Sequence, residues 1–310
     1  MKKSMKKSID SVAVIGAGAL GLLYADALSP VLGEGVFFVA GKERRTKINS
    51  TVYSINGREA RFRAVSPREL EAKPDLLIVA VKNQHLESIV PLLEGCTGKE
   101  TVVLSVLNGI SSEEFIRRHV PEARVLYSVA LGMDAVKEGN SLCFTNPGRL
   151  LVGTEENNPD DPSLRLVTDL FSRCGVEYEV PRDIIRSLWW KWMINIGVNQ
   201  VSAVTGAVYG LFQQMDELRA LMDEAMKETV EVARAQKVDL TEQDIRDWYT
   251  VLNGLGPEGK TSMLQDVEAK RTGEVEAFSG ALIELARRHG IPVPVNETLY
   301  RIVKAIEATY

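Results

Sequence analysis

The stretch SVAVIGAGALGLLYADAL, residues 11–28, contains a predicted strand, a glycine-rich turn and a predicted helix in direct succession. Its first five residues are mostly apolar and β-branched, which is typical of a buried strand, and residues 20–28 are expected to form an apolar helix. Between the two, Gly16 permits a tight turn, Gly18 lets a pyrophosphate approach the backbone, and Gly21 lets helix and strand pack closely. The sequence therefore predicts a dinucleotide site, with the phosphates at the helix N-terminus. The candidate cofactor-binding residues of this turn are Gly16, Ala17, Gly18, Ala19, Leu20 and Gly21.

Further apolar runs predict a parallel sheet with helices between its strands. We expect strands at Val36–Ala40, Asp75–Val81, Thr101–Val106, Arg124–Ala130, Leu142–Phe144, Arg149–Val152 and Val176–Val180, and a helix at Ser163–Cys174. Asn56-Gly57 predicts a hairpin within Tyr53–Ala64. After Pro181 the β-branched runs give way to long amphipathic stretches. The expected fold is therefore α/β, with a Rossmann-type parallel sheet domain at residues 1–182 and an all-helical domain at 183–310.

The residues after the second predicted strand bear on the choice of nicotinamide cofactor. An acidic residue at this position holds a ribose hydroxyl, whereas basic residues accommodate a 2′-phosphate. The sequence reads Gly41-Lys42-Glu43-Arg44-Arg45, so three cations stand against one acid. This favours NADP(H), with Lys42, Arg44 or Arg45 as the phosphate contact. A solvated charge cluster that opens the next helix is the alternative.

Two polar residues lie at the carboxyl ends of predicted strands. Lys82 follows Asp75–Val81, and Asn108 follows Thr101–Val106. In open α/β sheets, ligands bind outside the carboxyl ends of the strands. Both residues are therefore candidates for cofactor or substrate binding, although an ordinary turn would also explain each of them.

The segment LWWKWMINIGVNQVSAVTG, residues 188–206, is predicted to form a helix that carries three polar residues in a row. Lys191, Asn195 and Asn199 are spaced four apart, so they drift by only about 40° per step and share one face. The other faces are apolar, which indicates a buried helix. A buried lysine suggests a function, whereas a lysine that extends to the surface beside two core amides is the alternative.

A glycine-rich break, NGLGPEGK at residues 253–260, precedes another predicted helix. Ser262 and Gln265 fit an S-x-x-Q capping box, so helix capping alone would explain Ser262. Glu274 follows twelve residues later, about three helical turns on, and is expected near the same face as Ser262. An acid in such a position is ordinarily solvated.

The composition is that of an ordinary soluble protein. A net charge of −5 over 310 residues gives no sign of a nucleic-acid partner, and no apolar run approaches the roughly 18 residues of a membrane span. Three separated cysteines are expected to be reduced thiols in a cytoplasmic protein. The three histidines lack metal-ligand spacing, so no metal site is expected. Residues 1–8, MKKSMKKS, are followed by no small-residue cleavage site and are expected to be a frayed tail.

Taken together, these motifs resemble the ketopantoate reductase (2-dehydropantoate 2-reductase) family from Val12 to about Ile302. The resemblance lies in GAGALG at 16–21, VK at 81–82, NG at 108–109, the K-x3-N-x3-N series at 191–199, and SMLQD with a following glutamate at 262–274. The last two motifs are far more specific than the glycine motif. The resemblance implies a Rossmann domain that binds NADPH, a helical second domain, and reduction of ketopantoate to D-pantoate on the route to pantothenate and coenzyme A.

The resemblance also implies a role for each matching residue. Lys191 would donate a proton to the carbonyl oxygen as hydride arrives from the nicotinamide, and Glu274 would orient substrate and lysine. The implied substrate contacts are Asn195 and Asn199 for the hydroxyl and carboxylate, and Ser262 for the carboxylate, with Asn108 and Lys82 beside the nicotinamide ribose. A homodimer is expected, since the long predicted helices Asp216–Gln236 and Phe278–Ala286 could bury its interface.

Two positions depart from the family pattern. Gly259 replaces a substrate-binding asparagine three residues before the SMLQD serine, and Gly41 falls near the usual place of an arginine. Gly259 favours one alternative, a related reductase of another 2-oxo acid on the same fold. A second alternative is a regulator that binds NADPH without catalysis, but such a protein has no use for the proton donor Lys191.

Overall fold

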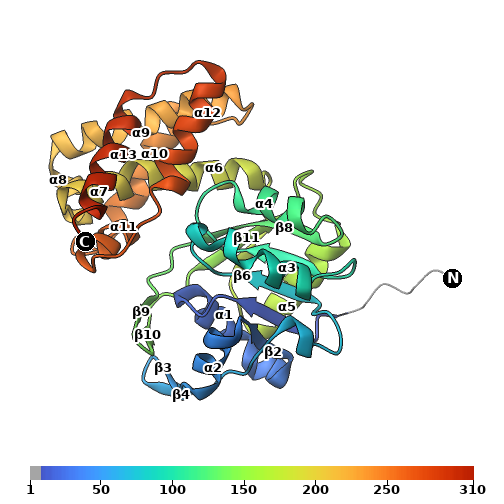
Figure 1. The fold of residues 1–310 in the computed structure, drawn as a ribbon. Helices are drawn as coiled ribbons and strands as arrows, with labels where there is room; N and C mark the ends of the chain where they lie inside the picture. Colours follow the sequence, from blue (N-terminus) through green and yellow to red (C-terminus); the bar gives the residue numbers. More distant parts are fainter. Residues whose placement is uncertain (1–7) are drawn as a thin grey trace. The chain divides into compact units, whose positions relative to one another are not determined.

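The computed structural model describes residues 8–310, and the chain divides into two compact units. The first unit ends at Ile184 and the second runs Ile185–Tyr310 (Figure 1). The frayed tail expected at Met1–Ser8 lies outside the described residues except for Ser8, whose hydroxyl donates to the Asp10 carboxylate (2.9 Å).

The first unit is built on an eight-stranded sheet with the order β12-β11-β8-β7-β6-β1-β2-β5. Its strands are β1 (Val12–Ile15), β2 (Val36–Val39), β5 (Ala64–Val65), β6 (Leu76–Val79), β7 (Val102–Ser105), β8 (Arg124–Leu131), β11 (Arg149–Gly153) and β12 (Tyr178–Glu179). All neighbours run parallel except β8 and β11, which are antiparallel. Because β2 and β6 lie on opposite sides of β1, the strand order reverses at β1, and ligands bind beyond the carboxyl ends of strands at such a point.

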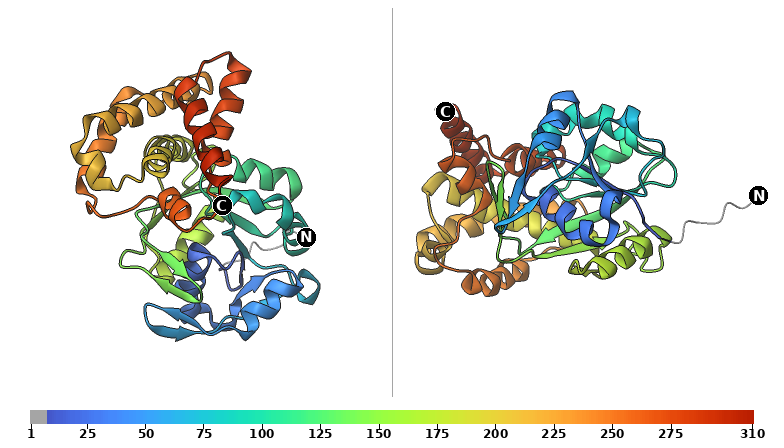
Figure 2. Two further views of the ribbon diagram at one scale, coloured as in Figure 1. Left: turned by 60° about the vertical axis from the view of Figure 1, so that its left-hand side comes forward. Right: turned by 90° about the horizontal axis from the view of Figure 1, so that it is seen from below.

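Helices cover both faces of this sheet, which is why its central strands are buried and apolar without alternation. In β1, Val12 and Val14 join one core cluster, whereas Ala13 and Ile15 join another. The first cluster includes residues of α1 and α5, and the second includes residues of α3 and α4 (Figure 2). The helices of this unit are α1 (Ala19–Leu32), α2 (Lys42–Ser50), α3 (Val90–Cys96), α4 (Ser112–His119) and α5 (Pro162–Cys174), with 3-10 turns at Gly33–Gly35, Pro67–Glu69, Asn83–His85 and Glu87–Ile89.

A small four-stranded sheet, β4-β3-β10-β9, completes the first unit. Its strands are β3 (Tyr53–Ile55), β4 (Arg58–Ala60), β9 (Val136–Glu138) and β10 (Ser141–Cys143). The predicted hairpin is confirmed: Asn56 and Gly57 connect the antiparallel β3 and β4 with φ angles of 48° and 81°.

The second unit is helical, and its central segment contains a π turn. Its helices are α6 (Ile184–Ile194), α7 (Gln200–Thr205), α8 (Tyr209–Gln214), α9 (Asp216–Ala235), α10 (Glu242–Gly254), α11 (Ser262–Glu268), α12 (Ala281–His289) and α13 (Pro294–Glu307), with π turns η5 (Asn195–Asn199) and η6 (Glu276–Gly280). The helix expected at residues 188–206 is confirmed as far as Thr205, but it contains one wide π turn, η5, between α6 and α7. The left view of Figure 2 looks nearly along this segment, which contacts α9, α11 and α13.

Candidate active site

The glycine turn between β1 and α1 has the geometry that a dinucleotide requires. Gly16 has a φ of +108°, and a Cβ there would lie 2.5 Å from the Ala80 carbonyl oxygen. A Cβ on Gly21 would lie 1.8 Å from the Gly16 carbonyl oxygen. Gly18 is exposed, and a Cβ there would meet nothing closer than 3.8 Å. Gly16 and Gly21 are therefore required by packing, whereas the space beside Gly18 is open to a ligand.

The N-terminus of α1 is available to a phosphate. Gly18 is its N-cap residue, and no side chain caps it within the part of the chain that the structure describes. The first backbone N–H groups of a helix lack internal partners and attract anions. Ala17, Ala19 and Leu20 are partly exposed beside them, so the residues present fit the pyrophosphate of a dinucleotide.

The three cations after β2 have different surroundings. α2 begins at Lys42, which is exposed, and Arg45 forms an ion pair with Glu69 (2.8 Å). Arg44 is exposed and forms no ion pair within residues 8–310. Burial, together with the charges of Lys47 and Arg44, lowers the pKa of Lys137 on β9. Lys42 and Arg44 are thus better able than Arg45 to meet an anion.

The turns after β6 and β7 lie side by side. β6 pairs with β7 in register Val79 to Ser105, and the Asn83 side chain donates to the Asn108 carbonyl oxygen (2.7 Å). Lys82 and Asn108 are both partly exposed at this carboxyl edge of the sheet. The structure therefore brings together the two strand ends that the sequence singled out.

A buried acid on α4, Glu113, was not predicted from the sequence. Glu113, on the first turn of α4, is 1% exposed and accepts from the Ser112 hydroxyl (2.8 Å). Ser112 lies 2.7 Å from the Ser105 hydroxyl, and Ser128 donates to the Ser105 carbonyl oxygen. Burial raises the pKa of Glu113 to about 7. An acid in the first turn of a helix is ordinary in sequence, so nothing marked this one as buried.

Three of the predicted substrate-binding residues meet in the second unit. The Asn199 amide nitrogen lies 3.3 Å from Asn195 Oδ1 and 3.4 Å from Ser262 Oγ. Asn195 and Asn199 are 9% and 6% exposed. The result is a cluster of two carboxamides and one hydroxyl that joins η5 to α11.

Ser262 is not the helix cap that its sequence context predicted. Thr261 is the N-cap of α11, and its hydroxyl accepts from the Leu264 N–H (3.2 Å). The cap is thus provided by Thr261, one position before Ser262. The Ser262 hydroxyl contacts the Asn199 amide instead. The expected capping box is therefore wrong.

Glu274 interacts electrostatically with Lys191, although its position does not follow from helical spacing. α11 ends at Glu268, so Glu274 is not on the same helix as Ser262. The expectation that the two residues lie near one helical face is therefore wrong. Burial lowers the pKa of Lys191 to about 8, and the charge of Glu274 opposes this shift. Trp192 and Ala277, the neighbouring parts of α6 and η6, are hydrogen-bonded (2.8 Å). Tertiary packing thus brings the acid near the lysine.

Gly259 is enclosed by an aromatic ring. A Cβ at this position would lie 2.8 Å from Cδ2 of Tyr209, and the Tyr209 N–H donates to the Gly259 carbonyl oxygen (3.0 Å). The Tyr209 ring therefore occupies the space that a side chain at residue 259 would need.

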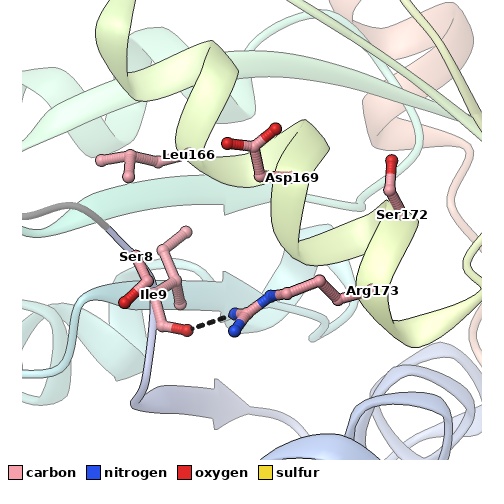
Figure 3. A pocket seen from close by; sticks show the side chains of 6 residues that line it. All are labelled: Ser8, Ile9, Leu166, Asp169, Ser172 and Arg173. Carbon is pink, nitrogen blue, oxygen red and sulfur yellow. Dashed lines mark hydrogen bonds between the residues drawn. The ribbon is translucent and has the colours of Figure 1, made fainter.

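Residues 8–310 contain no group of three or more histidine, cysteine, aspartate or glutamate side chains that could hold a metal ion. None of the helices described above is long and apolar enough to cross a membrane. Figure 3 shows a pocket of the first unit lined by Ser8, Ile9, Leu166, Asp169, Ser172 and Arg173. The Arg173 guanidinium already donates to the Ile9 carbonyl oxygen (2.7 Å), and no predicted site residue lines the pocket.

A Rossmann-type sheet with an open glycine turn, followed by a helical unit with a lysine and amide cluster, defines a class of nicotinamide-dependent oxidoreductases. Residues 12–157 match the family model "Ketopantoate reductase PanE/ApbA", and residues 183–307 match "Ketopantoate reductase PanE/ApbA C terminal". The chain belongs to the ketopantoate reductase family, which confirms the resemblance drawn from its motifs.

Individual relatives cover nearly the whole chain at low identity. The 2-dehydropantoate 2-reductase of Aquifex aeolicus is 25% identical over 95% of this chain and 96% of its own, and that of Pyrococcus horikoshii is 27% identical over 95% and 97%. A ketopantoate reductase structure from Ralstonia eutropha JMP134 has a TM-score of 0.83 at 24% identity, covering 96% of this chain and 99% of that one. A D-mandelate dehydrogenase solved with NADH and anilino(oxo)acetate has a TM-score of 0.85 at 22% identity, with the same coverage. The two solved structures share the fold.

Proposed function

We propose that this protein reduces 2-dehydropantoate to D-pantoate with NADPH, and that Lys191 is the proton donor. The observation that carries the proposal is the placement of Lys191: its pKa is lowered to about 8 by burial, and Glu274 acts on it. Such a lysine is still protonated at neutral pH but releases its proton more readily than an exposed one. This is what a general acid for carbonyl reduction requires.

The proposed mechanism needs one hydride and one proton. NADPH, when bound, supplies the hydride to the carbonyl carbon. The charge that develops on the carbonyl oxygen is taken up by the Lys191 ammonium, which passes its proton to that oxygen and leaves a neutral amine. Glu274 favours the charged lysine and so helps it regain a proton from solvent for the next turnover.

The amide and hydroxyl cluster supplies the contacts that hold a 2-oxo acid. Asn195 and Asn199 can donate to a carboxylate or accept from a substrate hydroxyl, and Ser262 can donate to the carboxylate. Their mutual contacts of 3.3 and 3.4 Å are long for hydrogen bonds, so an incoming carboxylate can replace them at small cost. We assign these three residues to substrate binding.

The cofactor is assigned to the first unit. The open space at Gly18 and the uncapped start of α1 support pyrophosphate binding by residues 16–21. The cations Lys42 and Arg44 support a 2′-phosphate, while Arg45 is held by Glu69. Lys82 and Asn108, at the adjoining strand ends, are assigned to the nicotinamide side.

A related reductase of another 2-oxo acid is the second candidate. Tyr209 occupies the space beside Gly259, where the family pattern has an asparagine side chain. A structural neighbour with the same fold is a D-mandelate dehydrogenase that was solved with NADH. The fold alone therefore does not decide the substrate or the cofactor. Substrate choice therefore needs a direct test.

The test is NADPH oxidation by the purified protein with ketopantoate, 2-oxoisovalerate, pyruvate or phenylglyoxylate, with NADH as the alternative cofactor. Lys191→Ala is expected to lower turnover by about 10²- to 10⁴-fold, the usual contribution of a general acid. Lys260→Ala, which loses only an exposed ion pair with Glu268, is the matched control. Efficient reduction of another oxo acid in place of ketopantoate would establish the second candidate.

We further propose that the protein works as a homodimer in the cytoplasm. A structural neighbour from Staphylococcus aureus, at 23% identity and a TM-score of 0.80, is described as a dimeric ketopantoate reductase. The two long helices that could bury such an interface are α9 and α12 with its preceding turn. Sedimentation velocity at micromolar concentration tests this: a single species with the mass of one chain would refute it.

A further inference from the structure

Both site-bearing segments of the second unit contain a π turn. η5 (Asn195–Asn199) holds the two candidate substrate amides, and η6 (Glu276–Gly280) begins two residues after Glu274. A π turn bonds residue i to i+5, so it interrupts the regular α-helical ladder, and such turns are frequent at functional sites. The two turns also contact each other. What holds them together therefore affects how the site is arranged.

Side chains bond to carbonyl groups inside both turns. The Trp192 indole, 1% exposed, donates from α6 to the Ala277 carbonyl oxygen in η6 (2.8 Å). The Gln200 amide donates to the Ile196 carbonyl oxygen in η5 (2.7 Å). Each π turn thus has a buried side-chain donor directed at its backbone.

Gln200 also connects the two turns. It is fully buried, its Oε1 accepts from the Ser279 hydroxyl in η6, and its Nε2 lies 3.3 Å from Asn296 Oδ1. Ser279 Oγ lies 3.0 Å from the same Asn296 oxygen. Gln200, Ser279 and Asn296 are thus in mutual polar contact, with the single Ser279 proton directed to Gln200 and the Gln200 amide nitrogen directed to Asn296; we call this set the amide node.

The amide node is anchored on two long helices. Asn296 is fully buried, and its Nδ2 donates to the Ala225 carbonyl oxygen (3.0 Å) and to Glu228 (2.8 Å) on α9. Glu228 also accepts the backbone N–H groups of Val295 and Asn296 at the start of α13 (2.8 and 2.9 Å). Every side-chain polar atom of Gln200 and Asn296 is thereby satisfied, so the node is a defined arrangement.

We propose that Gln200 is a positioning residue which, through Ser279 and Asn296, holds η5 against η6 and so fixes Lys191, Asn195 and Asn199 relative to Glu274. This inference rests on the proposed function. Gln200 follows Asn199 directly, so a shift of its side chain moves the amide that meets Ser262. Ser279 lies five residues after Glu274 on the opposing segment. A loosened node would therefore change both the substrate contacts and the field of Glu274 at Lys191.

The experiment compares Gln200→Met and Ser279→Ala, made singly and together, with Gln213→Met. Gln200→Met keeps the side-chain length and removes the hydrogen bonds, while Ser279→Ala opens the node from the η6 side. Gln213 is a partly buried glutamine of the same unit, and its amide donates to the Leu252 and Leu255 carbonyl oxygens (both 2.9 Å), which are not part of the node. All variants are expected to lose thermal stability, so the control shows what that loss alone does.

The decisive measurements are the kinetic and binding constants that a loss of stability alone does not change. For the node variants, the KM of the oxo acid should rise at least about fivefold, as expected for loss of a buried polar contact, while the Kd of NADPH stays unchanged. The alkaline limb of kcat/KM should shift, because among the described residues Glu274 is the charged group that acts on Lys191. The double variant should resemble either single one, since both open the same node. Equal KM values and pH profiles in node and control variants would overturn the proposal.

Hydrogen exchange separates this inference from the proposed function. In Gln200→Met, amide exchange should accelerate in residues 276–280 as well as 195–199, although the substitution lies beside only one turn. Acceleration in residues 195–199 alone would show that Gln200 does not couple the turns and would overturn the inference. Coupled acceleration in a protein whose Lys191→Ala variant keeps full activity would instead refute the proposed proton donor.

Discussion

The acidity of Lys191 is set by two opposing effects at the residue scale. Burial lowers its pKa to about 8, and Glu274 raises it. A general acid must be protonated to act, so the rate of oxo-acid reduction is expected to fall as the pH rises through about 8.

Replacing Glu274 removes the effect that favours the charged lysine. Glu274→Gln is therefore expected to move the alkaline fall of kcat/KM to lower pH, in addition to any loss of rate. Glu276→Gln is the matched control, because Glu276 bonds to Tyr300 and Lys304 and does not act on Lys191. An unchanged profile in Glu274→Gln would show that the limb does not report Lys191.

The contact between Gly259 and Tyr209 makes a second prediction at this scale. A Cβ on residue 259 would overlap the Tyr209 ring at 2.8 Å, so Gly259→Ala should destabilise the protein by about 1–3 kcal/mol, the usual cost of overpacking. Tyr209→Ala should relieve that cost in the double variant. A double-mutant cycle of urea unfolding measures the coupling, and strict additivity would contradict the predicted overlap.

At the scale of elements, Glu113 links α4 to β8 at Ser128 and, through Ser112, to the end of β7 at Ser105. Its pKa is raised from 4.5 to about 7, so the unfolded chain releases this proton at lower pH than the folded protein does. The stability that protonated Glu113 gives is present below about pH 4.5 and is lost as the pH rises through about 7. At one pKa unit per 1.4 kcal/mol, the loss amounts to about 3 kcal/mol.

Urea unfolding at pH 5 and pH 8 tests this coupling. The free energy of unfolding of Glu113→Gln should not show this fall between pH 5 and pH 8. Relative to the unmodified protein, the variant should therefore be more stable at pH 8 than at pH 5. Glu114→Gln, an exposed neighbour on the same helix, should show the pH dependence of the unmodified protein. A variant difference that is constant with pH would rule out a titrating Glu113.

The elements that were predicted from the sequence follow from local residue patterns, whereas those that were missed are determined by packing. The central strands β1, β2 and β6 were predictable because both faces of the large sheet are covered, so each of them is an unbroken apolar run, whereas the edge strand β5 was not expected. The cap of α11 was misplaced because Thr261 and Ser262 both carry hydroxyls, and only packing decides which one caps. The C-terminal end of α11 was not predicted because no glycine or proline occurs between Ser262 and Gly273. The π turns have no sequence signature of this kind, and the burial of Glu113 depends on the packing of α4 against β7 and β8.

At the scale of the whole molecule, the proposed reaction divides between the two units. The glycine turn belongs to the first unit and Lys191 to the second. If ligands on both units react, binding both should draw the units together. NADP+ with ketopantoate forms a pair that cannot react, so small-angle scattering can be recorded on the complex. The radius of gyration is expected to fall when both are present, and an unchanged value would refute closure.

The π turn η5 has a further consequence in genetic terms. An i→i+5 turn contains one residue more than an α-helical turn, so η5 is equivalent to a one-residue insertion in a long helix. An in-frame deletion of Gly197 would remove that extra residue, so α6 and α7 would join in one regular helix while Asn199 and Gln200 keep nearly their present direction relative to Lys191. The widened turn that carries Asn195 would be lost, but the helical segments on either side of it would not be rotated. Loss of one codon here should therefore be tolerated by the fold better than loss of one codon within α6 or α7, where every following side chain would turn by about 100°.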